Sequence, residues 1–287
     1  MYQIINGYRD NDTLRASFDA LSVHTFDLSF EKWYQNGFWS DNYNPYSIVI
    51  NGEIAANVSV NRMDMCIDGR DVRLIQLGTV MTKPEYRHRG LIREIMNRIE
   101  AEYADVDGMF LYANDSVLDF YPKFGFRKAK EFCCSKTVTQ SGQYAMERIP
   151  MDGPVQWAVF RKAMDENRFR GRCDMLRNPE LVFFYVSRFM RNNVFYSRDL
   201  DAYVVADYTG ADLKIFNIYT AQDVTLDDVI AAFGGEVKKV TLGFSPADST
   251  GFTQEELIEE DNTFFVKGAL FEAFQNEKLR MPFLSRA

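Results

Sequence analysis

Residues 80–99 read VMTKPEYRHRGLIREIMNRI and join an apolar strand to a helix through a basic turn. The strand is predicted over 72–81, and an amphipathic helix is predicted over 90–103. Gly90 would let a ligand approach the backbone closely. The first N–H groups of a helix lack internal partners and carry partial positive charge. This stretch therefore predicts an anion site suited to a diphosphate.

The positive charge of this turn contrasts with the rest of the chain. Between residues 83 and 98, five basic residues against two acids give a local charge of +3, whereas the whole chain has a net charge of −8. A solvated helix face explains such a charge as readily as an anion site does. The acidic balance repels phosphate backbones and argues against nucleic acid as a partner. It mildly favours a cationic small molecule. The five basic residues are Lys83, Arg87, Arg89, Arg93 and Arg98.

The sequence around the turn predicts a mixed α/β fold. Its composition, with 46% apolar and 26% charged residues, is that of a globular protein and excludes a disordered or fibrous chain. A hairpin is expected around Asn51-Gly52, and the continuous apolar run 108–113 is typical of a buried strand. Strands are expected at 2–5, 47–50, 54–60, 72–81, 108–113 and from 125 toward 138; helices are expected after Asp10 and at 30–39, 90–103 and 115–123; 40–45 is expected to be a loop.

The second half repeats this coarse order of helices and strands. The polar, glycine-bearing stretch 139–153 predicts a domain boundary, which divides the chain into 1–141 and 142–287. The second half lacks a diphosphate motif, so we expect it to be a degenerate copy that binds no cofactor. Helices are expected at 155–167, 179–192 and 226–233 (capped by Thr225), strands at 202–207, 213–219, 237–244 and 263–266, and a solvated helix face or loop at 255–261.

Two motifs resemble those of the GCN5-related N-acetyltransferases (GNAT). The residues Arg87-His88-Arg89-Gly90-Leu91-Ile92 resemble the family's pyrophosphate motif, Arg/Gln-x-x-Gly-x-Gly/Ala, and depart from it at Ile92, where a small residue is usual. Asn114 is followed seven residues later by Tyr121 and then by Gly125-Phe126, as in the family's next motif. The resemblance covers about the first 140 residues. It implies a tandem acyl-CoA N-acyltransferase fold similar to a shortened enhanced-intracellular-survival acetyltransferase.

The resemblance also implies a function and a set of site residues. It implies transfer of an acetyl group from acetyl-CoA to a primary amine. The acidic balance of the chain, and not the resemblance, favours a small, cationic acceptor such as a polyamine or an aminoglycoside. Tyr121 would protonate the departing thiolate, and Asn114 would contact the cofactor arm. The backbone of a splayed strand at Val80, Met81 and Thr82 would hold the pantetheine and the thioester, and the diphosphate would lie on Arg87, His88, Arg89, Gly90, Leu91 and Ile92.

A general base is harder to assign from the sequence. The strand 72–81 contains neither an acid nor a histidine, and Gln76 stands where relatives often carry a carboxylate. The amine could therefore lose its proton through water. Some tandem relatives are believed to use the C-terminal carboxylate, and this chain ends in an apolar segment, 280–287. We hypothesise that the Ala287 carboxylate reaches the first active site; the alternative is a tail packed only on the second domain.

The sequence is also compatible with other functions. Ile92 and the missing strand carboxylate suit a CoA-binding sensor without catalytic activity. An aminoacyl-transferring relative that uses charged tRNA is disfavoured by the acidic surface, and the second half could mediate interaction, including formation of a homo-oligomer. His24 could line the acceptor site. The aromatic residues Trp33, Tyr34, Phe38 and Trp39 could cradle a cation or simply pack in the core.

The sequence predicts neither a metal site nor a membrane partner. There are two histidines and four cysteines without a C-x-x-C pair, so zinc-ligand spacing is absent. We expect reduced thiols in a cytoplasmic protein. The first residues contain no apolar segment typical of a signal peptide, and no run approaches the length of a membrane span.

Overall fold

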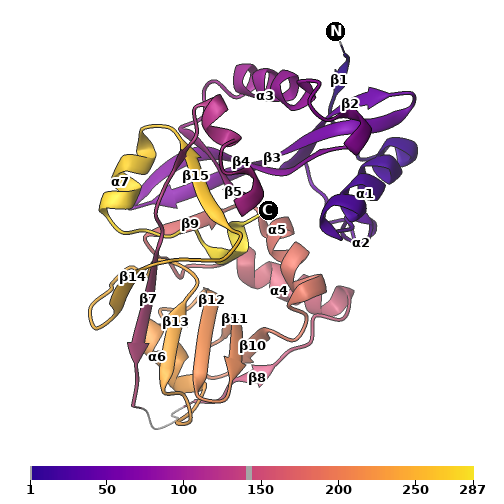
Figure 1. The fold of residues 1–287 in the computed structure, drawn as a ribbon. Helices are drawn as coiled ribbons and strands as arrows, with labels where there is room; N and C mark the ends of the chain where they lie inside the picture. Colours follow the sequence, from indigo (N-terminus) through magenta and orange to yellow (C-terminus); the bar gives the residue numbers. More distant parts are fainter. Residues whose placement is uncertain (1, 140–143) are drawn as a thin grey trace.

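The computed structural model describes residues 2–139 and 144–287. It contains two mixed β-sheets with helices packed on them (Figure 1). This confirms the α/β class expected from the sequence. The first sheet contains β1 (Ile4–Ile5), β2 (Tyr43–Ile50), β3 (Glu53–Ile67), β4 (Arg70–Thr82), β5 (Gly108–Ala113), β6 (Arg127–Lys128), β9 (Cys173–Leu176) and β15 (Thr263–Lys267). The second contains β7 (Phe132–Thr137), β8 (Glu147–Arg148), β10 (Val194–Ser197), β11 (Ala202–Thr209), β12 (Asp212–Thr220), β13 (Lys239–Leu242) and β14 (Thr253–Glu256).

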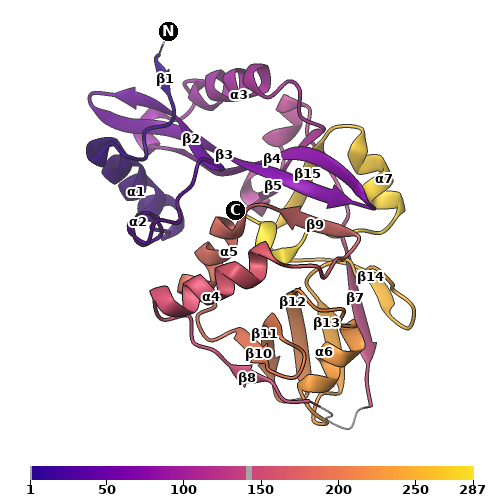
Figure 2. The same ribbon diagram turned by 180° about the vertical axis from the view of Figure 1, so that it is seen from behind.

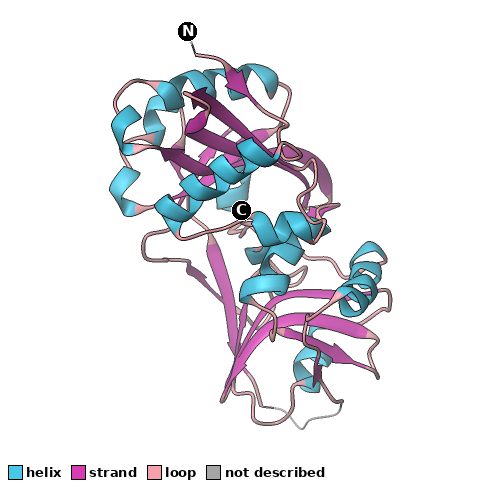
Figure 3. Cartoon of the chain, turned by 90° about the vertical axis from the view of Figure 1, so that its right-hand side faces the viewer, coloured by secondary structure: helices cyan, strands magenta, loops and turns pink. Residues whose placement is uncertain are grey.

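Helices cover both faces of the first sheet (Figure 3). Along β3, Ile54 packs in the cluster that holds Phe18, whereas Ala55 faces the cluster that holds Ile95. Successive residues of a strand point to opposite faces, so the two clusters lie on opposite sides of the sheet. The helices are α1 (Asp12–Phe26), α2 (Glu31–Gln35), α3 (Leu91–Glu102), α4 (Pro154–Asp165), α5 (Pro179–Phe184), α6 (Leu226–Ala232) and α7 (Leu270–Asn276); short turns are η1 (Pro84–Tyr86), η2 (Asp115–Val117), η3 (Tyr121–Phe124), η4 (Tyr185–Phe189) and η5 (Phe283–Ser285).

The two sheets exchange strands. The order of the first sheet is β1-β2-β3-β4-β5-β15-β6, with β9 paired to β3, and the order of the second is β14-β7-β13-β12-β11-β10-β8. Strand β7 thus comes from before the expected boundary and lies in the second sheet, while β9 and β15 come from after it and lie in the first (Figure 1). The boundary expected between residues 141 and 142 lies outside the described residues. The sheets do not follow the expected halves, 1–141 and 142–287, strand by strand.

The centre of the first sheet opens where β4 and β5 diverge. The two strands are parallel and pair only from Leu74 to Gln76 on β4. Beyond this point β4 stays paired to β3, and β5 stays paired to β15. The register of β4 against β3 also shifts between Asn57 and Ser59, which marks a bulge. The sheet therefore contains a wedge-shaped opening beside residues 77–82, as the family resemblance implies.

Several expected elements differ from those observed. The stretch 40–45 was expected to be a loop, but β2 already begins at Tyr43. The helix expected over 115–123 is two 3₁₀ turns, η2 and η3, because Pro122 removes a backbone donor. The helix expected over 179–192 ends as α5 and continues as the π turn η4. The acidic stretch 255–261 was expected to be a solvated helix face or a loop; its first two residues end β14, and the remainder is a loop as the second alternative predicts.

Other expectations hold closely. The hairpin around Asn51-Gly52 joins β2 and β3, and Thr225 caps α6 through a reciprocal capping box with Asp228. The four cysteines are free thiols. In the two described ranges, no helix is both long and apolar enough to cross a membrane.

Candidate active site

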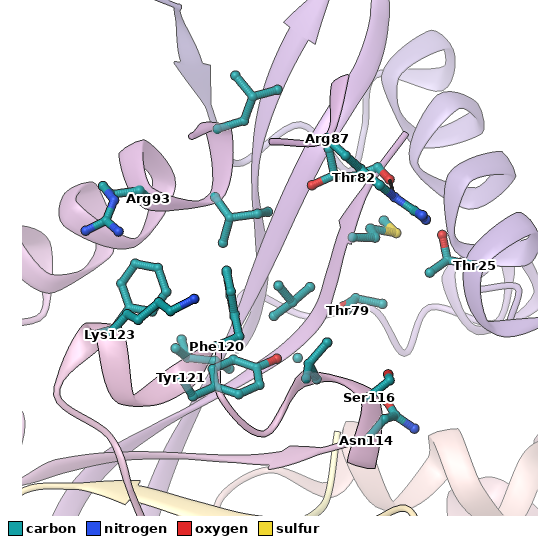
Figure 4. Close-up of a pocket in the computed structure, with 18 of the residues that line it drawn as sticks. Thr25, Thr79, Thr82, Arg87, Arg93, Asn114, Ser116, Phe120, Tyr121 and Lys123 are labelled. Carbon is teal, nitrogen blue, oxygen red and sulfur yellow. Dashed lines mark hydrogen bonds between the residues drawn. The ribbon is translucent and has the colours of Figure 1, made fainter. Parts of the chain in front are cut away.

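A cavity of about 1110 Å³ lies in the opening between β4 and β5, next to the first turn of α3 (Figure 4). The turns η2 and η3 form one wall, and the last turn of α1 forms another. The site residues that the family resemblance implies, and Ala287, all line this cavity. These residues are Val80, Met81, Thr82, Arg87, His88, Arg89, Gly90, Leu91, Ile92, Asn114, Tyr121 and Ala287.

The first turn of α3 presents its backbone donors to the cavity. Gly90 is the N-cap residue of α3 and has φ 76°, a left-handed conformation that favours glycine. The N-cap residue of α3 makes no side-chain hydrogen bond to the helix, so the first N–H groups of α3 are available to a ligand. A Cβ atom at Gly90 would meet nothing within 4 Å, and open space therefore lies above the turn. This donor set fits a diphosphate.

Four cationic side chains line the cavity near this turn: Arg87, Arg89, Arg93 and Lys123. Among the described residues, none of the four forms an ion pair. By contrast, Lys83 pairs with Glu53, and Arg98 pairs with Glu102 at 3.2 Å. Ion pairs within the protein thus account for the two outer cations, Lys83 before η1 and Arg98 on α3, whereas the four inner ones line the cavity.

A strained bulge in β4 shapes the cavity floor. Thr79 has φ 44°, which is unusual for a β-branched residue. Its hydroxyl lies 2.5 Å from the Tyr43 hydroxyl and donates to Ser59 Oγ at 2.8 Å. Asn57 donates from Nδ2 to the Thr79 carbonyl at 2.9 Å. These bonds offset a strain on the order of 1–3 kcal/mol and fix the bulge in one conformation.

Tyr121 directs its hydroxyl into the cavity (Figure 4). The residue is 6% exposed, and burial raises the pKa of its phenol to about 12. Its ring packs against Phe265 of β15 and Phe126. At neutral pH the side chain is therefore a fixed, protonated donor.

Asn114 is held by a residue from the second half of the chain. Its Nδ2 donates to Asp261 Oδ2 at 2.7 Å, and the N–H of Asp115 donates to Asp261 Oδ1 at 2.6 Å. The hydrogen bond from Asn114 lowers the pKa of Asp261. The side-chain nitrogen of Asn114 thus donates within the protein, and its side-chain oxygen is the atom that could accept a hydrogen bond from a ligand.

The end of the chain lies in the cavity. The N–H of Ala287 donates to Gln76 Oε1 at 2.9 Å, and Gln76 Nε2 donates to the Ala287 carboxylate at 3.1 Å. A Cβ atom on Gly78 would lie 3.0 Å from that carboxylate oxygen, so the close approach requires glycine. Gln76 therefore does not supply a carboxylate itself but binds the one at the chain end.

Residues 8–129 match the family model described as an acetyltransferase (GNAT) domain. The protein contains a GNAT acetyltransferase domain. A comparison with curated protein sequences gives no match.

Solved structures similar to this chain extend the likeness beyond the matched GNAT domain. A probable N-acyltransferase of unknown function from Enterococcus faecalis V583 is 15% identical, with a TM-score of 0.62 over 96% of this chain and 74% of that one. Eis1 from Mycobacterium abscessus is 12% identical, with a TM-score of 0.56 over 92% and 73%. A GCN5-related N-acetyltransferase from Kribbella flavida is 17% identical, with a TM-score of 0.54 over 92% and 71%. These likenesses concern the fold, and they support a GNAT fold repeated in tandem.

The tail that delivers Ala287 to the GNAT domain is buried between the two sheets. Arg286 is 8% exposed, donates to Glu131 at 3.1 Å, pairs with Glu259 and lies over the Tyr112 ring at 4.4 Å. Burial alone would lower the pKa of Arg286, but Tyr112 and the two carboxylates raise it. In Figures 1 and 2 the C-terminus accordingly lies at the centre of the molecule.

The tail contacts both sheets. Phe283 donates its N–H to the carbonyl of Gly243, just beyond β13, at 2.8 Å, and Met281 donates to Glu131 Oε1 at 2.8 Å. Ala287 then binds Gln76 on β4 of the GNAT domain. The alternative of a tail packed only on the second half is therefore wrong.

His24 does not line the cavity of the GNAT domain. It lies on a separate surface hollow with Glu53 and Lys83, because it faces the β2–β3 hairpin. The neighbouring Thr25 and Phe26, at the end of α1, line the cavity instead. Phe38 stacks on Phe183 with centroids 4.3 Å apart and is a core residue.

Three contributors to the site were missed at the sequence level. Thr79 forms the bulge, Lys123 adds a cation, and Asp261 holds Asn114. Gly78 was the available signal for the bulge, since an isolated glycine within a strand pattern often marks one. Asp261 gave no signal, because its partner lies 147 residues away in the chain.

Proposed function

We propose that the GNAT domain transfers an acetyl group from acetyl-CoA to a primary amine, with Tyr121 as general acid and the Ala287 carboxylate as general base. The observation that carries this proposal is that one cavity is lined by the cationic turn, by Tyr121 and by the chain end. A proton donor and a proton acceptor on one cavity are what acyl transfer from a thioester to an ammonium requires.

The residues of the cavity match the parts of the cosubstrate. The backbone donors of α3, with Arg87, Arg89 and Arg93, would hold the diphosphate. The edge of β4 at Val80, Met81 and Thr82 would bind the pantetheine arm, because β5 has already diverged from it. When bound, acetyl-CoA supplies an activated acyl carbon and a thiolate leaving group.

The chain's own groups then move the protons. The Ala287 carboxylate accepts a proton from the acceptor ammonium, which exposes the nitrogen lone pair for attack on the acyl carbon. Backbone N–H groups near the bulge at Thr79 stabilise the developing oxyanion. Tyr121 donates its proton to sulfur as the C–S bond breaks and the new C–N bond remains. The amide nitrogen releases its surplus proton to water, from which Tyr121 regains its own. The Ala287 carboxyl group releases the proton of the ammonium to solvent, which restores the carboxylate.

Calorimetric titration with acetyl-CoA tests the cofactor site. We expect micromolar binding by the intact protein and at least a tenfold loss in Arg87→Ala, because a diphosphate contact is removed. Arg198→Ala, on the exposed surface of the second half, is the matched control and should bind normally. No binding by the intact protein would overturn the proposal.

A screen of primary amines for CoA release tests the chemistry. Turnover with at least one amine is expected. Acetyl-CoA binding without turnover on any amine would contradict acyl transfer and favour the CoA-binding sensor.

A further inference from the structure

A second, smaller pocket of about 200 Å³ lies beside the main cavity. The two hollows share Phe26, Thr79 and Ala287 as lining residues. The chain-end carboxylate and the β4 bulge therefore stand at the junction between them. A molecule in the small pocket would present its end to the place where the proposed acyl transfer occurs.

The walls of the small pocket are apolar and come from both halves of the chain. The remaining lining residues are Leu28, Phe30, Trp33, Tyr43, Leu181 and Phe184. Leu181 and Phe184 belong to α5, which lies next to the C-terminus in Figures 1 and 2. Of the residues described in the structure, those lining this pocket include no Asp, Glu, Lys or Arg side chain. The Ala287 carboxylate is thus the charge available to a ligand there.

The side-chain polar atoms of Trp33 and Tyr43 on these walls already have hydrogen-bond partners within the protein. Trp33 donates from Nε1 to the carbonyl of Glu180 at 2.9 Å. The Tyr43 hydroxyl lies 2.5 Å from Thr79 Oγ1, and burial raises the pKa of Tyr43 above its usual value, so this phenol stays neutral. A polar group on the body of a ligand would lose its water here without gaining a partner, at a cost of about 1–3 kcal/mol.

The aromatic walls hold one another in place. Phe30 stacks on Tyr43 and Phe184 with centroids 5.2 Å and 5.5 Å apart. Trp33 meets Phe184 edge-on at 5.6 Å. Such packing fixes the shape of the pocket before a ligand arrives. An apolar cavity of about 150 Å³ accommodates benzene, so a pocket of about 200 Å³ has room for one ring and a short chain.

We infer that the acceptor is a primary amine joined by a short chain to one aromatic or branched aliphatic group. The apolar group occupies the small pocket, and the ammonium lies at the Ala287 carboxylate. This inference rests on the proposed function and names the substrate class of the same site. Polycations fit poorly, because a second ammonium would find no acid in the small pocket. A cation–π contact with its aromatic walls gives about 0.5–2 kcal/mol, whereas desolvation of the unpaired charge costs several kcal/mol.

The chain's net charge of −8 does not change this conclusion. It favoured a polyamine or an aminoglycoside as acceptor, since acids around a cleft concentrate cations. Among the described residues, no acidic side chain lines the small pocket, and Asp261, which lines the main cavity, accepts a hydrogen bond from Asn114. The small pocket therefore offers the single carboxylate of Ala287. An aminoglycoside, with several hydroxylated rings, also exceeds the volume of the pocket.

A comparison of kcat/KM values for three acceptors tests the inference. The intact protein is given acetyl-CoA and one of three probes: 2-phenylethylamine, spermidine or kanamycin. We expect kcat/KM to be at least tenfold higher for 2-phenylethylamine. Leu28→Trp, which fills the pocket, should raise KM for this amine at least tenfold and leave the Kd of acetyl-CoA unchanged. Val155→Trp, on the exposed face of α4, is the matched control and should change neither value.

A second variant reverses the preference. Leu28→Asp supplies the acid that the pocket lacks and should shift the ratio of kcat/KM values at least tenfold toward spermidine. Higher kcat/KM for spermidine or kanamycin with the intact protein, or no effect of Leu28→Trp, would overturn the inference and leave the proposed function intact. No turnover with any amine would overturn the proposed function and the inference together.

Discussion

Burial changes the proton affinity of two residues that lie far apart in the fold. Tyr121 in the cavity has a pKa of about 12, and Asp174 on β9 has a pKa of about 6. In both cases the surrounding protein disfavours the charged form. The consequences differ, because Tyr121 is proposed to act in the reaction, whereas Asp174 affects the stability of the fold.

Tyr121→Phe should lower kcat about 10²-fold or more, which is the contribution of a typical general acid. The phenylalanine ring keeps the packing against Phe265, so the Kd of acetyl-CoA should not change. Because the pKa of Tyr121 is raised to about 12, the intact enzyme should show no loss of activity from its ionisation between pH 7 and 10. Steady-state kinetics across this range measure both effects. A descending limb near the usual pKa of tyrosine would contradict the assignment.

Asp174→Asn should stabilise the protein at neutral pH. Burial raises the pKa of Asp174 to about 6, above its unfolded value near 4, so the folded state binds the proton more tightly. The free energy of unfolding is therefore highest at pH values below the unfolded-state pKa of Asp174. It falls as pH rises through the folded-state pKa. A tenfold difference in proton affinity between the two states corresponds to about 1.4 kcal/mol, so with partial exposure to solvent we expect a gain of about 1–2 kcal/mol.

Urea denaturation at pH 7.5 and 4.5 measures this difference. The asparagine keeps an oxygen for the N–H of Gly171, which lies 2.9 Å from Asp174 Oδ2. The stabilisation should be much smaller at the lower pH, because the folded state then holds the carboxyl group protonated and the two states differ less in proton binding. An equal gain at both values would show that the pKa of Asp174 is not its cause.

At the level of elements, the bulge in β4 and the end of the chain fit against each other. Thr79 adopts its left-handed conformation at the point where Gly78 leaves room for Ala287. Gln76, earlier on the same strand, binds both the N–H and the carboxylate of Ala287. A single strand thus positions the proposed oxyanion donors and the proposed base.

Gly78→Ala should reduce kcat with little effect on acetyl-CoA binding. The added Cβ would lie 3.0 Å from the Ala287 oxygen, so the chain end must shift by a few tenths of an ångström or more. Misplacement of a reacting group by about 1 Å costs up to 10²-fold, and we expect a loss of about tenfold. Gly153→Ala is the matched control, because its Cβ would meet its nearest neighbour at an ordinary 3.7 Å. Unchanged turnover in Gly78→Ala would argue against Ala287 as base.

At the level of the whole molecule, the second half of the chain completes the site of the first. Strand β15 extends the first sheet beside β5, α5 covers the small pocket, and Asp261 holds Asn114. The tail passes through a buried cluster of charges in which Glu131 and Glu259 surround Arg286. The second half is therefore part of the site even though it carries no diphosphate motif.

Extension of the chain beyond Ala287 should abolish most of the activity. Two added glycines replace the proposed base by an amide and move the free carboxylate away, and loss of a general base costs about 10²–10⁴-fold in kcat. A chain ended by a carboxamide at Ala287 separates charge from bulk and should show a similar loss. The same two glycines added before Met1 serve as the control. Steady-state rates with a saturating amine measure the effect, and full activity in the carboxamide form would exclude this role.

Much of the GNAT domain could be predicted from local sequence. The helix that begins at Gly90, the buried strand 108–113 and the two spaced motifs depend on periodicity and on single residues with special backbone freedom. The residues that the two motifs indicated for the cavity line it, whereas His24 does not. The sequence misplaced the helix over 115–123, because a proline within a short segment allows either a helix or tight turns.

The sequence by itself determined most of the elements and the charge and backbone freedom of the basic turn at 87–90, since these arise from neighbouring residues. Only the tertiary structure decided the exchange of strands between the sheets, the bulge at Thr79 and the partner of Asn114. It also placed Ala287 against Gln76, 211 residues away, and enclosed the aromatic pocket between α2 and α5. These features depend on contacts between distant segments, which local patterns of charge and hydrophobicity do not specify.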